Sequence, residues 1–212
     1  MRIRKSLLLA ATASLLTAGT IALAQQPGVN TNFAVVWNMV YEASTIKPTY
    51  SSSFLVNLAA SPTDVCGLRG SSTKTVRLRR VLLAGAASVV STEPVAINKL
   101  SSANTTGVSV SQTAIPYDST YAAASALAEH WTTYSTGGTT IGTLAEPFLT
   151  YSNYSTGVGA AQTVSFGQFG SAAVLRGTSQ QITVNLNGLT IPAGVGTAQL
   201  LCTFEWTEDN DN

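Results

Sequence analysis

Short runs of alternating apolar and polar residues, separated by turn-forming residues, cover most of the chain and predict β-strands rather than helices. The stretch at residues 174–206 holds two apolar runs joined by a turn at residues 192–194. Many short strands without a long helix predict an all-β fold, a single-domain antiparallel β-sandwich that is jelly-roll-like. We expect further strands at residues 50–60, 65–69, 75–84, 94–100, 108–115, 144–151 and 163–169.

Two segments of the chain share a sequence pattern. Residues 68–78 read LRGSSTKTVRL and residues 175–186 read LRGTSQQITVNL, which indicates two related β elements, one in each half of the chain. We expect the strands at residues 65–69 and 75–84 to pair with each other around the turn at residues 70–72.

The strand pattern is irregular at two places. After Leu78 the apolar residues move to the other side of the strand, so we expect a bulge or a change of sheet near Arg79 and Arg80. Residues 121–134 are rich in alanine and follow Asp118, a residue type that often begins a helix, while their threonine-rich surroundings favour a strand. Both conformations fit this segment.

The first 24 residues have the features of a secretory signal peptide. Arg2, Arg4 and Lys5 precede a short apolar stretch, and residues 22–24 form a small-x-small cleavage site, so the exported chain is expected to begin at Gln25. The alternative is an uncleaved membrane anchor, but polar residues interrupt the stretch well short of the roughly 20 apolar residues that a span requires. We therefore expect a periplasmic, cell-surface or extracellular protein with no membrane span after cleavage.

The chain beyond this leader, residues 1–24, divides into three parts. Residues 25–49 are expected to form an N-terminal arm, in which the apolar run FAVVWNMVY at residues 33–41 is either a first strand or an assembly arm. Residues 50–207 form the sandwich domain, and no linker or charge run divides it. Residues 208–212 are expected to form an acidic tail without fixed structure.

Charge is sparse on the expected mature chain. Beyond the leader there are eight basic and ten acidic residues, a net charge of −2, among many Ser, Thr, Asn, Gln and Gly residues. Such a chain has little long-range attraction for nucleic acid, which excludes that class of partner. Weak repulsion between copies favours a homo-oligomer.

Cys66 and Cys202 are the two cysteines of the chain. Each lies on the apolar side of an alternating run, Cys66 with Leu68 and Cys202 with Phe204. Because an exported chain folds under oxidising conditions, we expect a disulfide between them, with two buried free thiols as the alternative.

Residues with catalytic or binding chemistry are few and scattered. His130 is the only histidine and stands in no metal-binding or G-x-S-x-G pattern, so we expect no catalytic residue, no metal and no cofactor. A basic cluster of Lys74, Arg77, Arg79 and Arg80 is interpreted as the solvent face of a strand. Six aromatic residues in loop-rich regions form a candidate sugar-stacking surface, with packing in the core as the alternative: Tyr117, Tyr121, Trp131, Tyr134, Tyr151 and Tyr154.

Four motifs occur together between residues 62 and 209: PTDVCGLRGSSTKTVRLRRV, ANTTGVSVSQTAIPYDS, VLRGTSQQITVNLNG and a closing FEWTED. In these motifs the chain resembles a family of uncharacterised phage- and bacterium-encoded proteins. The resemblance implies a compact β fold and a structural role in particles or on surfaces, and it brings no catalytic residues. The leader is a departure from what an ordinary virion protein needs.

These patterns predict an exported, non-catalytic structural or interaction protein, one that self-assembles or binds a surface protein, at a surface or in a phage-like particle. A carbohydrate-binding module of the cell envelope, with a glycan as partner, is the alternative because exposed aromatic rings stack on sugars. A secreted hydrolase ranks third, because a glycosidase needs two carboxylates in one cleft and the acids here are scattered: Asp64, Glu93, Glu129, Glu146 and Glu205.

Overall fold

The computed structural model describes residues 47–59, 61–135, 137–153, 160–167, 172–189, 191 and 198–209. The part of the chain from Lys47 onward forms one compact unit, and the regular elements described in it are all strands. The expected signal peptide and the apolar run at residues 33–41 lie outside the described residues. Over the described ranges, no helix has the length and apolarity needed to cross a bilayer.

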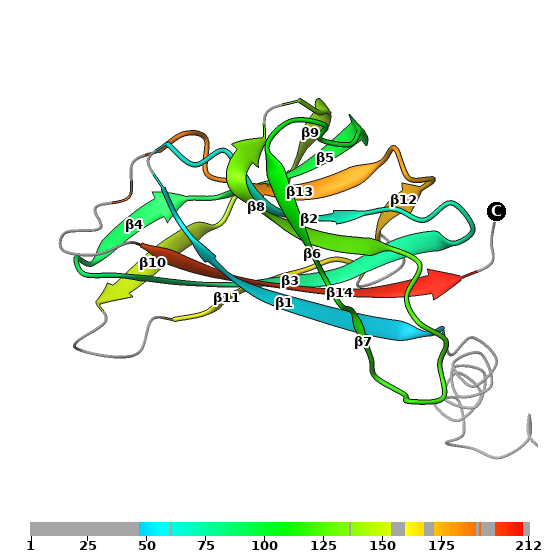
Figure 1. The fold of residues 1–212 in the computed structure, drawn as a ribbon. Helices are drawn as coiled ribbons and strands as arrows, with labels where there is room; N and C mark the ends of the chain where they lie inside the picture. Colours follow the sequence, from blue (N-terminus) through cyan, green and yellow to red (C-terminus); the bar gives the residue numbers. More distant parts are fainter. Residues whose placement is uncertain are drawn as a thin grey trace, which may run out of the picture. The chain divides into compact units, whose positions relative to one another are not determined.

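The strands form two sheets that pack face to face, so the prediction of an all-β sandwich is confirmed (Figure 1). The eight-stranded sheet has the order β4-β10-β3-β14-β1-β7, with β11 and β12 also paired to β3, and the six-stranded sheet has the order β6-β8-β2-β13-β5-β9. Neighbours are antiparallel except β10 and β3, which run parallel. The strands are β1 (Thr49–Asn57), β2 (Asp64–Arg69), β3 (Thr75–Ala87), β4 (Ser91–Pro94), β5 (Ala96–Ser102), β6 (Val108–Gln112), β7 (Ile115–Pro116), β8 (Leu127–Ser135), β9 (Thr139–Ala145), β10 (Phe148–Asn153), β11 (Gln162–Ser165), β12 (Ala173–Arg176), β13 (Gln181–Asn185) and β14 (Gln199–Asp209).

The two segments with the LRG pattern lie against each other, and each carries the chain from one sheet to the other. A Cβ added at Gly70 would lie 2.4 Å from the carbonyl oxygen of Gly177, so only glycine allows this approach. The first segment leads from β2 in the six-stranded sheet to β3 in the eight-stranded sheet, and the second leads from β12 back to β13. The expected pairing of residues 65–69 with 75–84 was therefore wrong, because the turn after Gly70 crosses between sheets instead of folding back.

The irregularity predicted near Arg79 and Arg80 is present as a bulge. Along the β3–β14 ladder, Glu205 pairs with Arg80 and Trp206 pairs with Leu78, so Arg79 has no residue opposite it. One extra residue on β3 reverses which side of the strand faces the core, as the sequence pattern required. The alanine-rich segment at residues 121–134 becomes strand β8 from Leu127 onward.

The prediction of an acidic tail without fixed structure at residues 208–212 was wrong for its first two residues. Glu208 and Asp209 are the last residues of β14, 4% and 9% exposed, and they pair with Val76 and Thr75 of β3. Burial of these two carboxylates is tolerated because each accepts hydrogen bonds from another segment, Glu208 from Ser125 and Asp209 from Arg77. Residues 210–212 lie outside the described residues.

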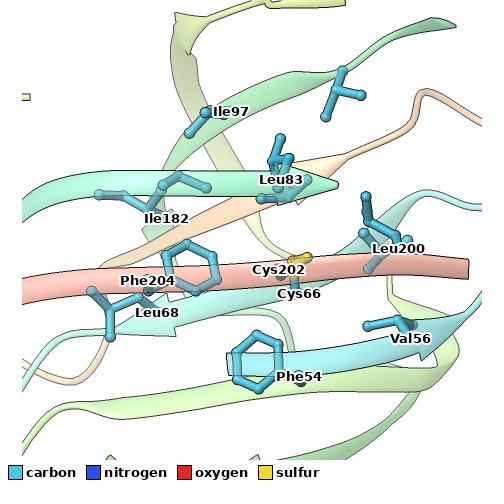
Figure 2. Packing of buried hydrophobic residues seen from close by; sticks show 14 of the residues in the cluster. Phe54, Val56, Cys66, Leu68, Leu83, Ile97, Ile182, Leu200, Cys202 and Phe204 are labelled. Atoms are coloured by element: carbon cyan, nitrogen blue, oxygen red, sulfur yellow. A yellow bond between two sulfur atoms is a disulfide. The ribbon is translucent and has the colours of Figure 1, made fainter. Parts of the chain in front are cut away.

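The core lies between the sheets and is crossed by the predicted disulfide, which is confirmed (Figure 2). Cys66 of β2 and Cys202 of β14 are joined with their Cα atoms 6.7 Å apart, and both are 0% exposed. The bridge thus links the two sheets through the middle of the apolar cluster. Alternation along β14 places the side chains of Leu200 and Phe204 on the same side as Cys202.

Gly85→Ala is expected to lower the free energy of unfolding by about 2 kcal/mol, because the core has no room for the added methyl group. A Cβ at Gly85 of β3 would lie 2.5 Å from a ring carbon of Tyr151, whose side chain is fully buried. Urea unfolding measures the loss. Gly142→Ala on β9 is the matched control, since a Cβ there has open space around it. Equal stability of the two variants would contradict this packing of Gly85 against Tyr151.

Candidate functional site

Two of the six aromatic residues predicted to form a binding surface lie in the interior, so that prediction was wrong for them. Trp131 is 1% exposed and Tyr151 is 0% exposed. Gly67 gives Trp131 room, since a Cβ at Gly67 would lie 3.0 Å from the edge of the indole, and Gly85 does the same for Tyr151. Large rings bury more apolar area than other side chains, and a glycine on a neighbouring strand makes that burial available.

The other aromatic residues do not gather into one surface. Tyr134 is half-buried, and its hydroxyl contacts the backbone nitrogen and oxygen of Ala59. Tyr121 is half-buried, whereas Tyr117 is 58% exposed and donates its hydroxyl to Glu205 at 2.8 Å. Tyr154 lies outside the described residues. A flat platform of several rings, as sugar stacking requires, is not formed by the described members of this set.

His130 takes part in packing. Its ring lies 5.6 Å from that of Phe54, and the Nδ1 atom is buried with no hydrogen-bond partner among the described residues. Burial lowers the pKa of His130, so the imidazole is neutral at pH 7. Over the described ranges, no group of three or more His, Cys, Asp or Glu residues is arranged to hold a metal ion.

The predicted basic cluster is distributed among acidic partners along β3 and β14. Arg80 and Glu205 form an ion pair at 2.5 Å on the outer face of the eight-stranded sheet, and Arg77 binds Asp209 at 2.8 Å. Arg79 and Arg80 are exposed, which agrees with the interpretation as a solvent face. The positive charges therefore do not form a continuous patch.

Two buried acids of the six-stranded sheet belong to one hydrogen-bonded network. Glu129 accepts from Arg69 and from Gln181, each at 2.8 Å, and Gln181 accepts from the backbone nitrogen of Asn104 at 2.8 Å. The Asn104 amide then donates to Asp64 at 2.6 Å. These acids join the segment after β5 to β2, β8 and β13. Sequence analysis gave no signal for the network, because its members are separated by tens of residues along the chain.

A third buried acid, Glu208, fixes the segment before β8. Its carboxylate accepts from the backbone nitrogens of Ser125 and Ala126, from the Ser125 hydroxyl at 2.6 Å, and from the indole nitrogen of Trp206 at 3.0 Å. Tyr50 stacks on Trp206 with ring centroids 5.9 Å apart. Glu208 therefore ties the end of β14 to residues 125 and 126, whose backbone would otherwise lack these partners.

Asp209 makes stability depend on acid pH. Burial by itself raises the pKa of this carboxyl, but hydrogen bonds and positive charge from Lys47 and Arg77 outweigh burial and lower the pKa to about 2. A depressed folded-state pKa stabilises the fold fully above the unfolded-state value of about 4, and this stabilisation is lost as pH falls toward 2. We expect Asp209→Asn to flatten the dependence of the urea midpoint on pH between about 4 and 2. Parallel pH profiles for the two proteins would contradict this assignment.

An open sheet edge is the feature of the described surface best suited to binding. Strand β6 is the edge of the six-stranded sheet, and all five of its residues are exposed, including Val108 at 56% and Val110 at 43%. Its ladder with β8 is regular from Ser109 to Gln112. Among the described residues, no strand pairs with its other side. The strand VSVSQ carries no charge and no proline, and its one register shift, between Val108 and Ser109, lies at its first residue.

A groove of about 400 Å³ lies beside the end of this strand. Residues 111–114 line one side of the groove. The other side is lined by Ala123, Ala124, Ala126 and Leu127, so most of the lining side chains are small. The second wall is held in place by the Glu208 carboxylate, which binds the backbone at residues 125 and 126. The edge of β6 and this groove together form the candidate site, which we call the β6 edge.

No protein-family model, no curated protein and no solved structure matches this chain. The geometry therefore carries the functional argument by itself. Its main features are buried acids that bind groups of the fold and a sheet edge that stays available for another chain.

Proposed function

We propose that this protein is an exported, non-catalytic structural protein that assembles with copies of itself at a cell surface or in a phage-like particle. The β6 edge is the observation that carries the proposal. Soluble sandwiches normally protect each edge strand with charges, prolines, bulges or covering loops, because a bare edge pairs with other chains. The β6 edge is regular from Ser109 to Gln112, is uncharged and carries two exposed valines, so it is suited to a contact made by strand addition.

The positions of three acids support a non-catalytic role. A general acid or base must reach the proton of a bound substrate. Asp64, Glu129 and Glu208 are instead buried and bound to amide, guanidinium or backbone donors of the fold. They stabilise the sandwich by satisfying donors that would otherwise be buried without a partner.

Two further observations support the place and type of action. The buried Cys66–Cys202 disulfide is typical of a protein that folds in an oxidising compartment, which agrees with export. The resemblance to phage- and bacterium-encoded proteins and the low net charge both favour a role in which many copies lie close together.

Light scattering on the exported protein tests the proposal. We expect a mass greater than that of one chain, which increases with protein concentration because association follows mass action. Deleting residues 25–41 should lower the number of chains in the assembly. The circular dichroism spectrum should still show β-sheet, since the compact unit that holds the strands begins at Lys47. A mass of one chain over the whole accessible concentration range would contradict assembly. Glycan binding by such a single chain would favour the carbohydrate-binding module instead.

A further inference from the structure

We propose that residues 33–41 of one copy add as a strand to the β6 edge of a second copy. This inference rests on the proposed assembly and names the segment and the edge that meet. Strand addition supplies backbone hydrogen bonds along the edge and places alternate side chains in neighbouring pockets.

The other outer strands that the structure describes are shorter than β6 or carry features that block pairing. Strands β11 and β12, each paired only with β3, have four residues, and β12 ends in Arg176. The ladder of β9 with β5 is broken by three register shifts, between Ile97 and Asn98 and on each side of Leu100. Strand β4 ends in Glu93 and Pro94, and a charge and a proline are two devices that block pairing. Strand β7 has two residues, one of them a proline. Strand β1 pairs with β14 and in part with β7, and it also lies near β8 and β6 of the other sheet.

The segment at residues 33–41 has the sequence that the β6 edge requires. It reads FAVVWNMVY, with no charge, proline or glycine, and nine residues are enough to span β6 and reach the groove. In an extended strand, successive side chains point to opposite sides, so its larger residues share one side. These are Phe33, Val35, Trp37, Met39 and Tyr41, which complement a groove lined mainly by alanine, serine and threonine.

The β6 edge and the point where the chain enters β1 lie toward different ends of β1. β7 runs antiparallel to β1, with Ile115 opposite Ser51 and Pro116 opposite Tyr50. Residues before Ile115, including β6, therefore lie toward the Asn57 end of β1, whereas the chain enters β1 at its opposite end (Figure 1). Pairing with β6 of the same copy would need the chain to fold back between the segment and β1, a reversal of ordinary hairpin length, so the dependence of association on protein concentration decides between the two cases.

The experiment compares full-length variants that place a charge on the edge, on the segment or elsewhere. Val110→Lys alters the β6 edge, and Trp37→Lys alters the segment. Val90→Lys is the matched control, because Val90 is 61% exposed and lies between β3 and β4, away from β6. We expect the first two changes to weaken association at least tenfold by light scattering, while the control associates like the parent protein. Val108→Lys is the second edge variant if Val110→Lys loses its β-sheet signal.

Mixing the two defective variants gives a more selective result. The Val110→Lys chain keeps an intact segment and the Trp37→Lys chain keeps an intact edge, so one functional contact can form between them. We expect the mixture to give complexes of two different chains and no larger species, although neither variant associates by itself. Hydrogen exchange should then show protection of the β6 amides that increases with protein concentration.

Each contrary outcome has a distinct meaning. If the parent protein assembles and Val110→Lys assembles equally well, the edge assignment is wrong and the proposed function stands. If Trp37→Lys assembles as well as the parent protein, residues 33–41 are not the strand that binds the edge. If the β6 amides of a single chain are protected to the same degree at every protein concentration, the segment pairs with β6 of its own copy. That result overturns the proposed contact between two copies. A parent protein that stays a single chain overturns the proposed function together with this inference.

Discussion

Replacing both Cys66 and Cys202 with alanine is expected to lower the free energy of unfolding by about 5 kcal/mol. The bridge joins residues separated by 136 positions, and the entropy that a disulfide removes from the unfolded chain increases with the length of the loop it closes. A loss of this size is comparable to the total stability of many domains. Urea denaturation of the oxidised parent and the double variant measures it.

A reductant provides an internal control for this experiment. Unfolding and refolding the parent protein with a reductant present should give the urea midpoint of the double variant. The same reductant should leave the double variant unchanged, because that protein has no cysteine. A loss below about 1 kcal/mol would mean that the loop closed by Cys66 and Cys202 is already constrained in the unfolded state.

Glu208→Ala is expected to lower the free energy of unfolding by about 3 kcal/mol, because it leaves buried donors without an acceptor. The backbone nitrogen of Ala126 and the indole nitrogen of Trp206 both donate to this carboxylate, at 2.9 and 3.0 Å. Glu208→Gln should cost less, since one amide oxygen can still accept from them. Urea unfolding gives the loss, and hydrogen exchange should localise it to residues 125 and 126.

Glu205→Ala is the matched control on the same strand. Glu205 binds the exposed guanidinium of Arg80 and the hydroxyl of Tyr117 at the surface, where removal of an ion pair costs about 1 kcal/mol or less. If Glu205→Ala destabilised the protein as much as Glu208→Ala, the effect would come from negative charge on β14 and not from buried hydrogen bonds.

Local alternation in the sequence was enough to predict the class of the fold and several of its details. The bulge at Arg79 followed from the change of apolar side after Leu78, because one strand can keep both runs inward only by gaining a residue. Cys66 and Cys202 followed from their apolar neighbours and the expected oxidising compartment. These features depend on residues next to each other in the chain, whose side chains have a fixed relation in a strand.

Partners far apart in the chain could not be assigned in this way. Strand β2 leads to the other sheet instead of turning back on β3, and at this crossing Gly70 lies against Gly177, more than a hundred residues away along the chain.

The sequence by itself determined that the chain forms strands, where one of them bulges and which cysteines face the core. Only the tertiary structure decided that Trp131 and Tyr151 are buried, because a glycine on another strand makes room for each ring. It also decided that Glu208 belongs to β14, because its donors at residues 125 and 126 come from a segment more than 80 positions away. Alternation reports which side of a strand is apolar, but it does not report which strand lies beside it.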